Sequence, residues 1–234
     1  MADTIQRAES RTRPLSIIDL GLIAYSDCWE LQKRLASERA EGAIGDTLLL
    51  LEHPHTYTCG RRGGREHILI SEHELDAHGI EVLDVDRGGD VTYHGPGQLV
   101  AYPIVRLADE GHVADYHAYL RTLEQVLIDT LAHFAISAFR VGDYTGVWVR
   151  AGESEEKIAA VGVKVDGRGV SSHGVALNVN TNLDYFSYIV PCGIAERGVT
   201  SMQRLLGTPL PMSDVKAAFV AAFCAGFNFT PAQR

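Results

Sequence analysis

Four cysteines supply the candidate nucleophiles of this chain, and one of them differs from the others in its surroundings. Cys28 lies on an apolar stripe at helical spacing, and Cys224 lies near the end of the last expected helix. Cys192 instead lies within Pro191-Cys192-Gly193-Ile194, where proline and glycine disfavour both a helix and a central strand. A thiol acts as a nucleophile only where a nearby cation or base lowers its pKa. Sequence position alone leaves Cys192 open as either a nucleophile or a structural residue.

Two lysines on one expected strand, residues 157–165, could supply that cation. Lys157 and Lys164 are seven positions apart, so strict strand alternation directs them to opposite faces of the sheet. Lysines on exposed strands also serve to protect sheet edges. His173 enters the next expected strand, where a histidine is more commonly a hydrogen-bonded structural residue than a catalyst. The residue types alone do not identify the partner of the thiol.

A glycine-rich stretch, Arg87-Gly88-Gly89-Asp90-Val91-Thr92-Tyr93-His94-Gly95-Pro96-Gly97-Gln98, carries the other polar side chains of interest. Glycine allows a backbone to take positive φ or to lie close against a ligand. The stretch is compatible with two tight turns around a short hairpin, and equally with the wall of a pocket; the arginine and histidine favour the pocket. It matches neither a dinucleotide fingerprint nor a P-loop, so it gives no support to nucleotide binding.

A second glycine-rich loop, residues 52–65, contains three arginines within five residues: Arg61, Arg62 and Arg65. The loop is either a solvated turn or a local landing site for an acidic partner. The chain as a whole is acidic, with a net charge of -9, which argues against nucleic acid as a partner. No apolar run approaches the roughly 18 residues that a membrane span requires.

The elements that must position these groups follow from periodicity and turn signals. Alternation or apolar runs predict strands at 16–20, 47–51, 80–85, 99–104, 136–141, 146–149, 157–165 and 170–179. Helical spacing predicts a helix from Ala24 to Gly42, a short one opened by a capping box at Ser71, a long one over 116–134, and a last one over 213–226. Strands and helices mix without strict alternation, which predicts an α+β fold with a mixed sheet.

Domain organisation and compartment follow from length and composition. We expect a flexible N-terminal arm over residues 1–15 and a single catalytic domain over 16–234, since this length supports one large core. The cysteines are widely spaced, with no C-x-x-C pair to indicate zinc or redox chemistry. A chain of this size does not need disulfide bonds, so we expect a cytoplasmic protein.

Taken together in order, four segments closely resemble the lipoyl(octanoyl) transferases, the lipoate-protein ligase B family. They are the stretch from Arg87 to Gln98, then Lys157-Ile158-Ala159, then the segment from Ser172 to Asn180, then Pro191-Cys192-Gly193. The order and spacing fit from about residue 16 to residue 226. The resemblance implies a mixed β-sheet flanked by helices, similar to the biotin- and lipoate-protein ligases.

The resemblance also implies an activity and its partners. The family moves an octanoyl group from octanoyl-acyl carrier protein, through a thioester on Cys192, to a lysine of lipoyl-accepting domains in 2-oxoacid dehydrogenases and the glycine cleavage H protein. This octanoyl transfer is the first step of protein lipoylation. It implies Lys157, and not Lys164, as the partner of the thiol, and it implies no cofactor, no metal, no nucleic acid and no membrane. The residues implied to bind substrate are Arg87, Gly88, Gly89, Asp90, Val91, Thr92, Tyr93, His94, Ala160, Val161, Gly162, Gly174, Val175 and Ala176.

Small residues beside this site, such as Ala159, Ala160 and Gly162, are expected to leave room for an alkyl chain. Three alternatives remain. An ATP-dependent lipoate or biotin ligase on the same fold needs no cysteine, and Pro191-Cys192-Gly193 argues against it. A non-catalytic module that binds the acyl carrier is the second. A zinc hydrolase built on His53, His55 and Cys59 is the third, and it lacks a fourth ligand at a suitable spacing.

Overall fold

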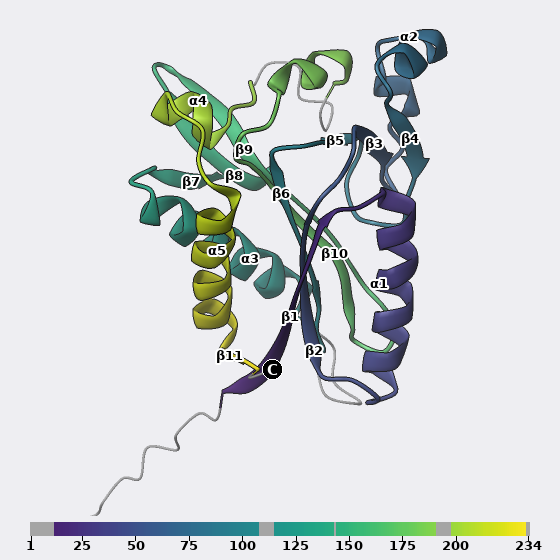
Figure 1. Cartoon of the computed structure of the whole chain (residues 1–234), viewed down its shortest axis with the longest axis vertical. Coiled ribbons are helices and arrows are strands. Elements are labelled where there is room, and N and C mark those ends of the chain that lie inside the picture. Colours follow the sequence, from purple (N-terminus) through teal and green to yellow (C-terminus); the bar gives the residue numbers. More distant parts are fainter. Residues whose placement is uncertain (1–11, 108–114, 143, 191–197, 233–234) are drawn as a thin grey trace, which may run out of the picture.

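The computed structural model describes residues 12–107, 115–142, 144–190 and 198–232. Their strands form two sheets, one of eight strands and one of three. The large sheet has the order β11-β1-β2-β6-β10-β9-β8-β7 (Figure 1). Its strands are β1 (Arg13–Leu22), β2 (Asp46–Glu52), β6 (Gln98–Ile104), β7 (Ala138–Val141), β8 (Tyr144–Ala151), β9 (Ser154–Val165), β10 (Ser171–Asn178) and β11 (Phe229–Pro231).

Strand directions make this a mixed sheet, as the sequence predicts. β1 runs parallel to both β2 and β11, and every other neighbouring pair in the large sheet is antiparallel. β2 and β6, at the centre, are buried almost throughout, which explains their continuous apolar sequences. The α+β prediction is therefore confirmed.

Helices cover both faces of the large sheet (Figure 1). One face packs against α1 (Tyr25–Ala40), which buries Cys28 and Leu35 among the strands. The opposite face packs against α3 (Tyr116–His133) and α5 (Met212–Phe227), whose apolar stripes share a second core. Each of these three helices lies within a few residues of its predicted range, because helical periodicity reports directly which face is buried.

The three-stranded sheet has the order β4-β3-β5 and its own small core. It consists of β3 (Thr56–Cys59), β4 (Glu81–Asp84) and β5 (Thr92–His94). Between β3 and β4 lie a 3₁₀ turn over Arg65–His67 and α2 (Glu72–Ala77), which begins with the expected capping box at Ser71. The sequence predicts a loop where β3 lies, because a four-residue strand next to a glycine-rich loop carries too little periodicity to detect.

The first strand begins earlier than expected. β1 starts at Arg13 and Leu15 is fully buried, so residues 13–15 belong to the sheet rather than to a flexible arm. Pairing with β11 holds this end of the chain, a long-range contact that local patterns do not contain. No helix among the described residues has both the length and the apolarity of a membrane span.

Candidate functional site

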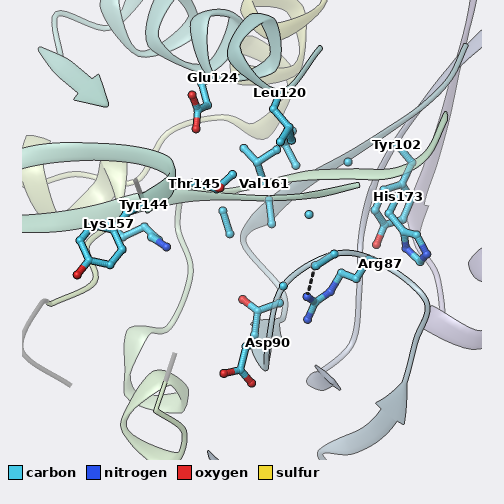
Figure 2. Close-up of a pocket in the computed structure, with 18 of the residues that line it drawn as sticks. Arg87, Asp90, Tyr102, Leu120, Glu124, Tyr144, Thr145, Lys157, Val161 and His173 are labelled. Atoms are coloured by element: carbon cyan, nitrogen blue, oxygen red, sulfur yellow. Dashed lines mark hydrogen bonds between the residues drawn. The ribbon is translucent and has the colours of Figure 1, made fainter. Parts of the chain in front are cut away.

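A cavity of about 650 Å³ opens where β8 separates from β9. Figure 2 shows Lys157 and Tyr144 on one side of it, Tyr102 and His173 on the other, and Val161 between them. Of the predicted substrate-binding residues, those lining the cavity are Arg87, Gly88, Gly89, Asp90, Thr92, His94, Ala160, Val161, Gly162, Gly174, Val175 and Ala176. The structure thus gathers residues from three distant segments around one space.

Two predicted substrate-binding residues do not line the cavity. Val91 and Tyr93 are fully buried in the core of the small sheet, where Tyr93 stacks on Tyr185. Thr92 and His94, which alternate with them along the chain, line the cavity instead. Strand alternation explains the division, because successive side chains on β5 point to opposite faces.

The glycine-rich stretch from Arg87 to Gln98, here called the glycine-rich loop, closes directly on β9. The amide of Gly88 donates to the carbonyl of Val163 at 3.0 Å, at a part of β9 that β8 does not reach. A Cβ on Gly162 would lie 3.2 Å from both the Arg87 side chain and the Gly88 carbonyl. Gly162 lines the cavity, and its missing side chain also lets the glycine-rich loop approach β9 closely.

Arg87 fixes this loop to the small sheet. Its guanidinium is buried and donates from Nε and Nη2 to the Thr58 hydroxyl, at 3.2 and 2.8 Å. Burial lowers the pKa of His94 well below its usual value, and the neighbouring His53 and the Arg87 charge add to that effect. His94 is therefore neutral near neutral pH.

The part of residues 52–65 that follows β3, here called the basic loop for its three arginines, supports the glycine-rich loop from outside. The amide of Arg61 donates to the Arg87 carbonyl, and that of Arg62 donates to the Gly89 carbonyl, both at 3.1 Å. Both arginine side chains are exposed, and Arg62 lines the cavity. Arg65 pairs with Asp84 at 3.0 Å on the surface. This loop is thus more than a solvated turn, because its backbone supports the cavity wall.

A β-bulge positions Lys157. Trp148 of β8 pairs with Lys157 and Val147 pairs with Ala159, so Ile158 of β9, between them, has no partner on β8. The bulge interrupts strict alternation, so the seven-residue spacing alone does not place Lys157 and Lys164 on opposite faces of the sheet. The two lysines nonetheless differ in place, since Lys157 lines the cavity whereas Lys164 does not and pairs with Asp86.

The bulge is held from both sides. Gly146 has a φ of +118°, and a Cβ there would lie 2.7 Å from the Ala159 carbonyl oxygen. Its amide donates to Oε1 of Glu124, a buried carboxylate that also pairs with Arg121 and Arg140. The Lys157 ammonium lies 4.8 Å from the centre of the Trp148 ring, within reach of a cation–π contact.

Cys192 lies outside the described residues, but the chain on either side of it is described. The amide of Val190 donates to the His67 carbonyl at 2.9 Å. Beyond the gap, the Lys157 amide donates to the Gly198 carbonyl at 2.9 Å, and the Thr200 amide donates to the Lys157 carbonyl at 3.0 Å. The segment that carries Cys192 in sequence is therefore followed by residues paired with the backbone of Lys157.

The other cysteines are buried free thiols. Burial raises the pKa of Cys28 to about 12, and it also raises the pKa values of Cys59 and Cys224. Such thiols are protonated near neutral pH and are poor nucleophiles.

The histidines of the zinc alternative have hydrogen-bond partners of their own. Nδ1 of His53 donates to the Ile23 carbonyl at 2.8 Å, and Nδ1 of His55 lies 2.7 Å from the Tyr93 hydroxyl. Within the part of the chain that the structure describes, no three histidine, cysteine, aspartate or glutamate side chains lie together as the ligands of a metal ion would. Nothing in this geometry supports the hydrolase.

Several cavity residues were not expected from the sequence: Tyr25, Tyr102, Tyr116, Leu120, Glu124 and Tyr144. The first four lie in elements whose patterns predict only burial, whereas Glu124 lies off the apolar stripe of its helix and Tyr144 precedes the strand expected at 146–149. Local sequence carries no signal that these faces meet around a cavity, since the contacts depend on how the elements are arranged in three dimensions.

Comparison with known proteins gives a consistent result. Residues 24–224 match the family described as the lipoyl protein ligase A/B catalytic domain. The chain is 50% identical to the octanoyltransferase of Chloroflexus aggregans over 219 residues, which covers 94% of this chain and 97% of the relative. It is 49% identical to the octanoyltransferase of a Roseiflexus species over 220 residues, covering 94% and 90%.

Solved structures show the same fold at low identity. A bipartite lipoate protein ligase from Thermoplasma acidophilum superposes with a TM-score of 0.70 at 18% identity, covering 95% of this chain and 86% of that one. The prediction of a fold similar to the lipoate-protein ligases is confirmed.

The buried histidines predict a loss of stability in mild acid. Burial lowers the pKa of His53 to about 4, whereas an unfolded histidine titrates near 6.5. Between those values the unfolded chain takes up a proton that folded His53 does not, so the free energy of unfolding falls as pH falls, by about 3 kcal/mol from this one group. Urea unfolding from pH 7 to pH 4 should show this slope, and His53→Gln should make it shallower. An unchanged slope in the variant would contradict a neutral buried His53.

Proposed function

Because the chain belongs to the octanoyltransferase family of the lipoyl protein ligase A/B catalytic domain, we propose that it moves an octanoyl group from octanoyl-acyl carrier protein to a lysine of a lipoyl-accepting domain. The observation that carries this proposal is the cavity that runs along β9 from Lys157, a length of sheet surface suited to an acyl tail. Burying an eight-carbon tail contributes about 0.8 kcal/mol per methylene, several kcal/mol in total.

The proposed reaction has two steps. The Cys192 thiolate attacks the thioester carbonyl of the donor, and the carrier's thiolate leaves and takes up a proton. The amine of the acceptor lysine then attacks the new thioester, forming an amide and releasing Cys192. The first step exchanges one thioester for another and is close to isoenergetic, and the second runs downhill. The two-step reaction therefore needs no nucleotide.

Lys157 is the proposed partner of the thiol in both steps. As an ammonium it favours the thiolate by opposite-charge attraction, which lowers the pKa of the cysteine. Acylation removes that attraction, so Lys157 gives up its proton more readily and serves as base for the incoming amine. Its place on the cavity wall supports this role.

Chain connectivity supports the pairing of Cys192 with Lys157. Cys192 precedes Gly198 by six residues, and the Gly198 carbonyl accepts from the Lys157 amide. The buried state of Cys28, Cys59 and Cys224 adds further support.

The partners of the reaction are proposed from family and charge. The acceptors are lipoyl-accepting domains of 2-oxoacid dehydrogenases and the glycine cleavage H protein; the similar Thermoplasma ligase is described together with its E2 lipoyl domain. The exposed side chains of Arg61 and Arg62, the second of which lines the cavity, suit an acidic donor. The free thiols of Cys28, Cys59 and Cys224 suit a reducing cytoplasm.

Incubation with octanoyl-acyl carrier protein tests this function. We expect intact mass to show one octanoyl group, labile to hydroxylamine, and peptide mapping to place it on Cys192. The Cys192→Ala variant should carry no adduct and should transfer nothing to a lipoyl domain. An adduct on another cysteine would contradict the mechanism. ATP-dependent pyrophosphate exchange with octanoate, without any adduct, would identify a ligase instead.

Separate alanine variants of Lys157 and Lys164 test the proposed partner. Removing the ammonium of Lys157 should raise the pKa of Cys192, measured by alkylation against pH, and lower transfer by about 100-fold or more. Lys164→Ala is the matched control on the same strand, because Lys164 pairs with Asp86 and does not line the cavity. It should leave the thiol pKa unchanged. The reverse pattern would assign the role to Lys164.

A further inference from the structure

The end of the cavity away from Lys157 is made of four ring side chains, here called the cavity floor: Tyr25, His94, Tyr102 and His173 (Figure 2 labels the last two with Lys157 opposite). They come from α1, β5, β6 and β10, and all are buried. Tyr25 joins the others, since its ring centre lies 5.6 Å from that of His94 and its hydroxyl lies 3.2 Å from Nδ1 of His173.

The hydrogen bonds of the floor fix where each hydroxyl proton lies. Burial lowers the pKa of His173, so the ring is neutral, and its Nε2 donates to the Asp86 carboxylate at 2.8 Å. Nδ1 is then an acceptor, and the Tyr25 hydroxyl donates to it. In the same way His53 donates to the Ile23 carbonyl and accepts from the Tyr102 hydroxyl at 3.0 Å. Both hydroxyl protons are therefore used inside the protein and not offered to the cavity.

The backbone at this end is held in an uncommon conformation. His173 has a φ of +54°, in the left-handed region, which a residue with a side chain adopts only when its surroundings impose it. Its amide donates at 2.7 Å to Oε1 of Gln32, a buried side chain of α1. The same helix thus holds His173 twice, through Gln32 at the backbone and through Tyr25 at the ring.

We propose that Tyr25 ends the acyl cavity and sets the longest acyl chain that the protein accepts. The inference rests on the proposed acyl transfer at Lys157, which places the carboxyl end of the chain there and its methyl end at the floor. A methyl group needs a wall without free hydroxyl protons, and the floor provides one. An additional methylene must displace a bulky ring that is buried and packed on all sides, which a flexible side chain such as methionine would not require.

The test compares acyl chains of six to twelve carbons in wild type, Tyr25→Ala and Tyr25→Phe. Wild type should favour eight carbons. In Tyr25→Ala, kcat/KM for the ten-carbon donor relative to the eight-carbon donor should rise about tenfold, since each newly buried methylene favours binding several-fold. Tyr25→Phe keeps the ring, so its preferred length should match wild type.

Cys28→Ala is the matched control, because Cys28 lies on the same helix and is fully buried but does not line the cavity. It should lower thermal stability without moving the preferred length. Tyr25→Leu, a smaller truncation, serves if Tyr25→Ala does not fold. An unchanged length preference in a folded Tyr25→Ala or Tyr25→Leu would overturn the proposal, as would a shift in Tyr25→Phe equal to that in Tyr25→Ala.

Binding of free fatty acids of the same lengths, measured by calorimetry, separates this inference from the proposed function. Binding requires no transfer, so the cutoff in length and its shift in Tyr25→Ala should appear there too. If they appear while wild type transfers no octanoyl group, the floor is supported and the transferase proposal fails. If transfer occurs but neither measurement shows a shift, the floor proposal alone fails.

Discussion

The cavity depends on the closure of one loop on one strand. β8 leaves β9 after Ala159, and the amide of Gly88 then takes up the carbonyl of Val163 that β8 does not reach. The contact is close at Gly162, where a Cβ would lie 3.2 Å from the Arg87 side chain and from the Gly88 carbonyl. Arg87 fixes the other side of the loop to Thr58 of the small sheet, and the backbone of the basic loop braces it from outside. This closure places Arg87, Gly88, Gly89 and Asp90 along one wall of the cavity.

The same separation of β8 from β9 determines where the chemistry is proposed to occur. The bulge at Lys157, held by Gly146 and the buried carboxylate of Glu124, places the lysine on the cavity wall. The returning chain at Gly198 and Thr200 pairs with the backbone of that lysine. The same strand therefore serves both proposed roles, because β9 carries Lys157 and also forms the surface along which the acyl tail is proposed to lie.

Patterns in the sequence predict what depends on local burial. The apolar run at 47–51, the helical stripe of α3 and the capping box at Ser71 each report a local environment, and the structure confirms them. The cavity floor could not be predicted this way, because Tyr25 and Tyr102 lie in patterns that signal only a buried face. The bulge at Lys157 could not be predicted for a different reason, since one unpaired residue changes the alternation of side chains without changing the composition of the strand. Family resemblance supplied the grouping of residues around the cavity that periodicity alone does not contain.

Binding of octanoate to Gly162→Ala, measured by calorimetry, tests the loop closure most directly. Gly167→Ala is the control, because a Cβ at Gly167 would meet no atom within 4 Å. We expect Gly162→Ala to fold and to bind octanoate at least about tenfold more weakly than wild type, since the new methyl group would lie 3.2 Å from the Arg87 side chain and the Gly88 carbonyl and would displace the loop that lines the cavity. Gly167→Ala should bind as wild type does. Unchanged octanoate affinity in Gly162→Ala would contradict the central claim that this closure forms the acyl site.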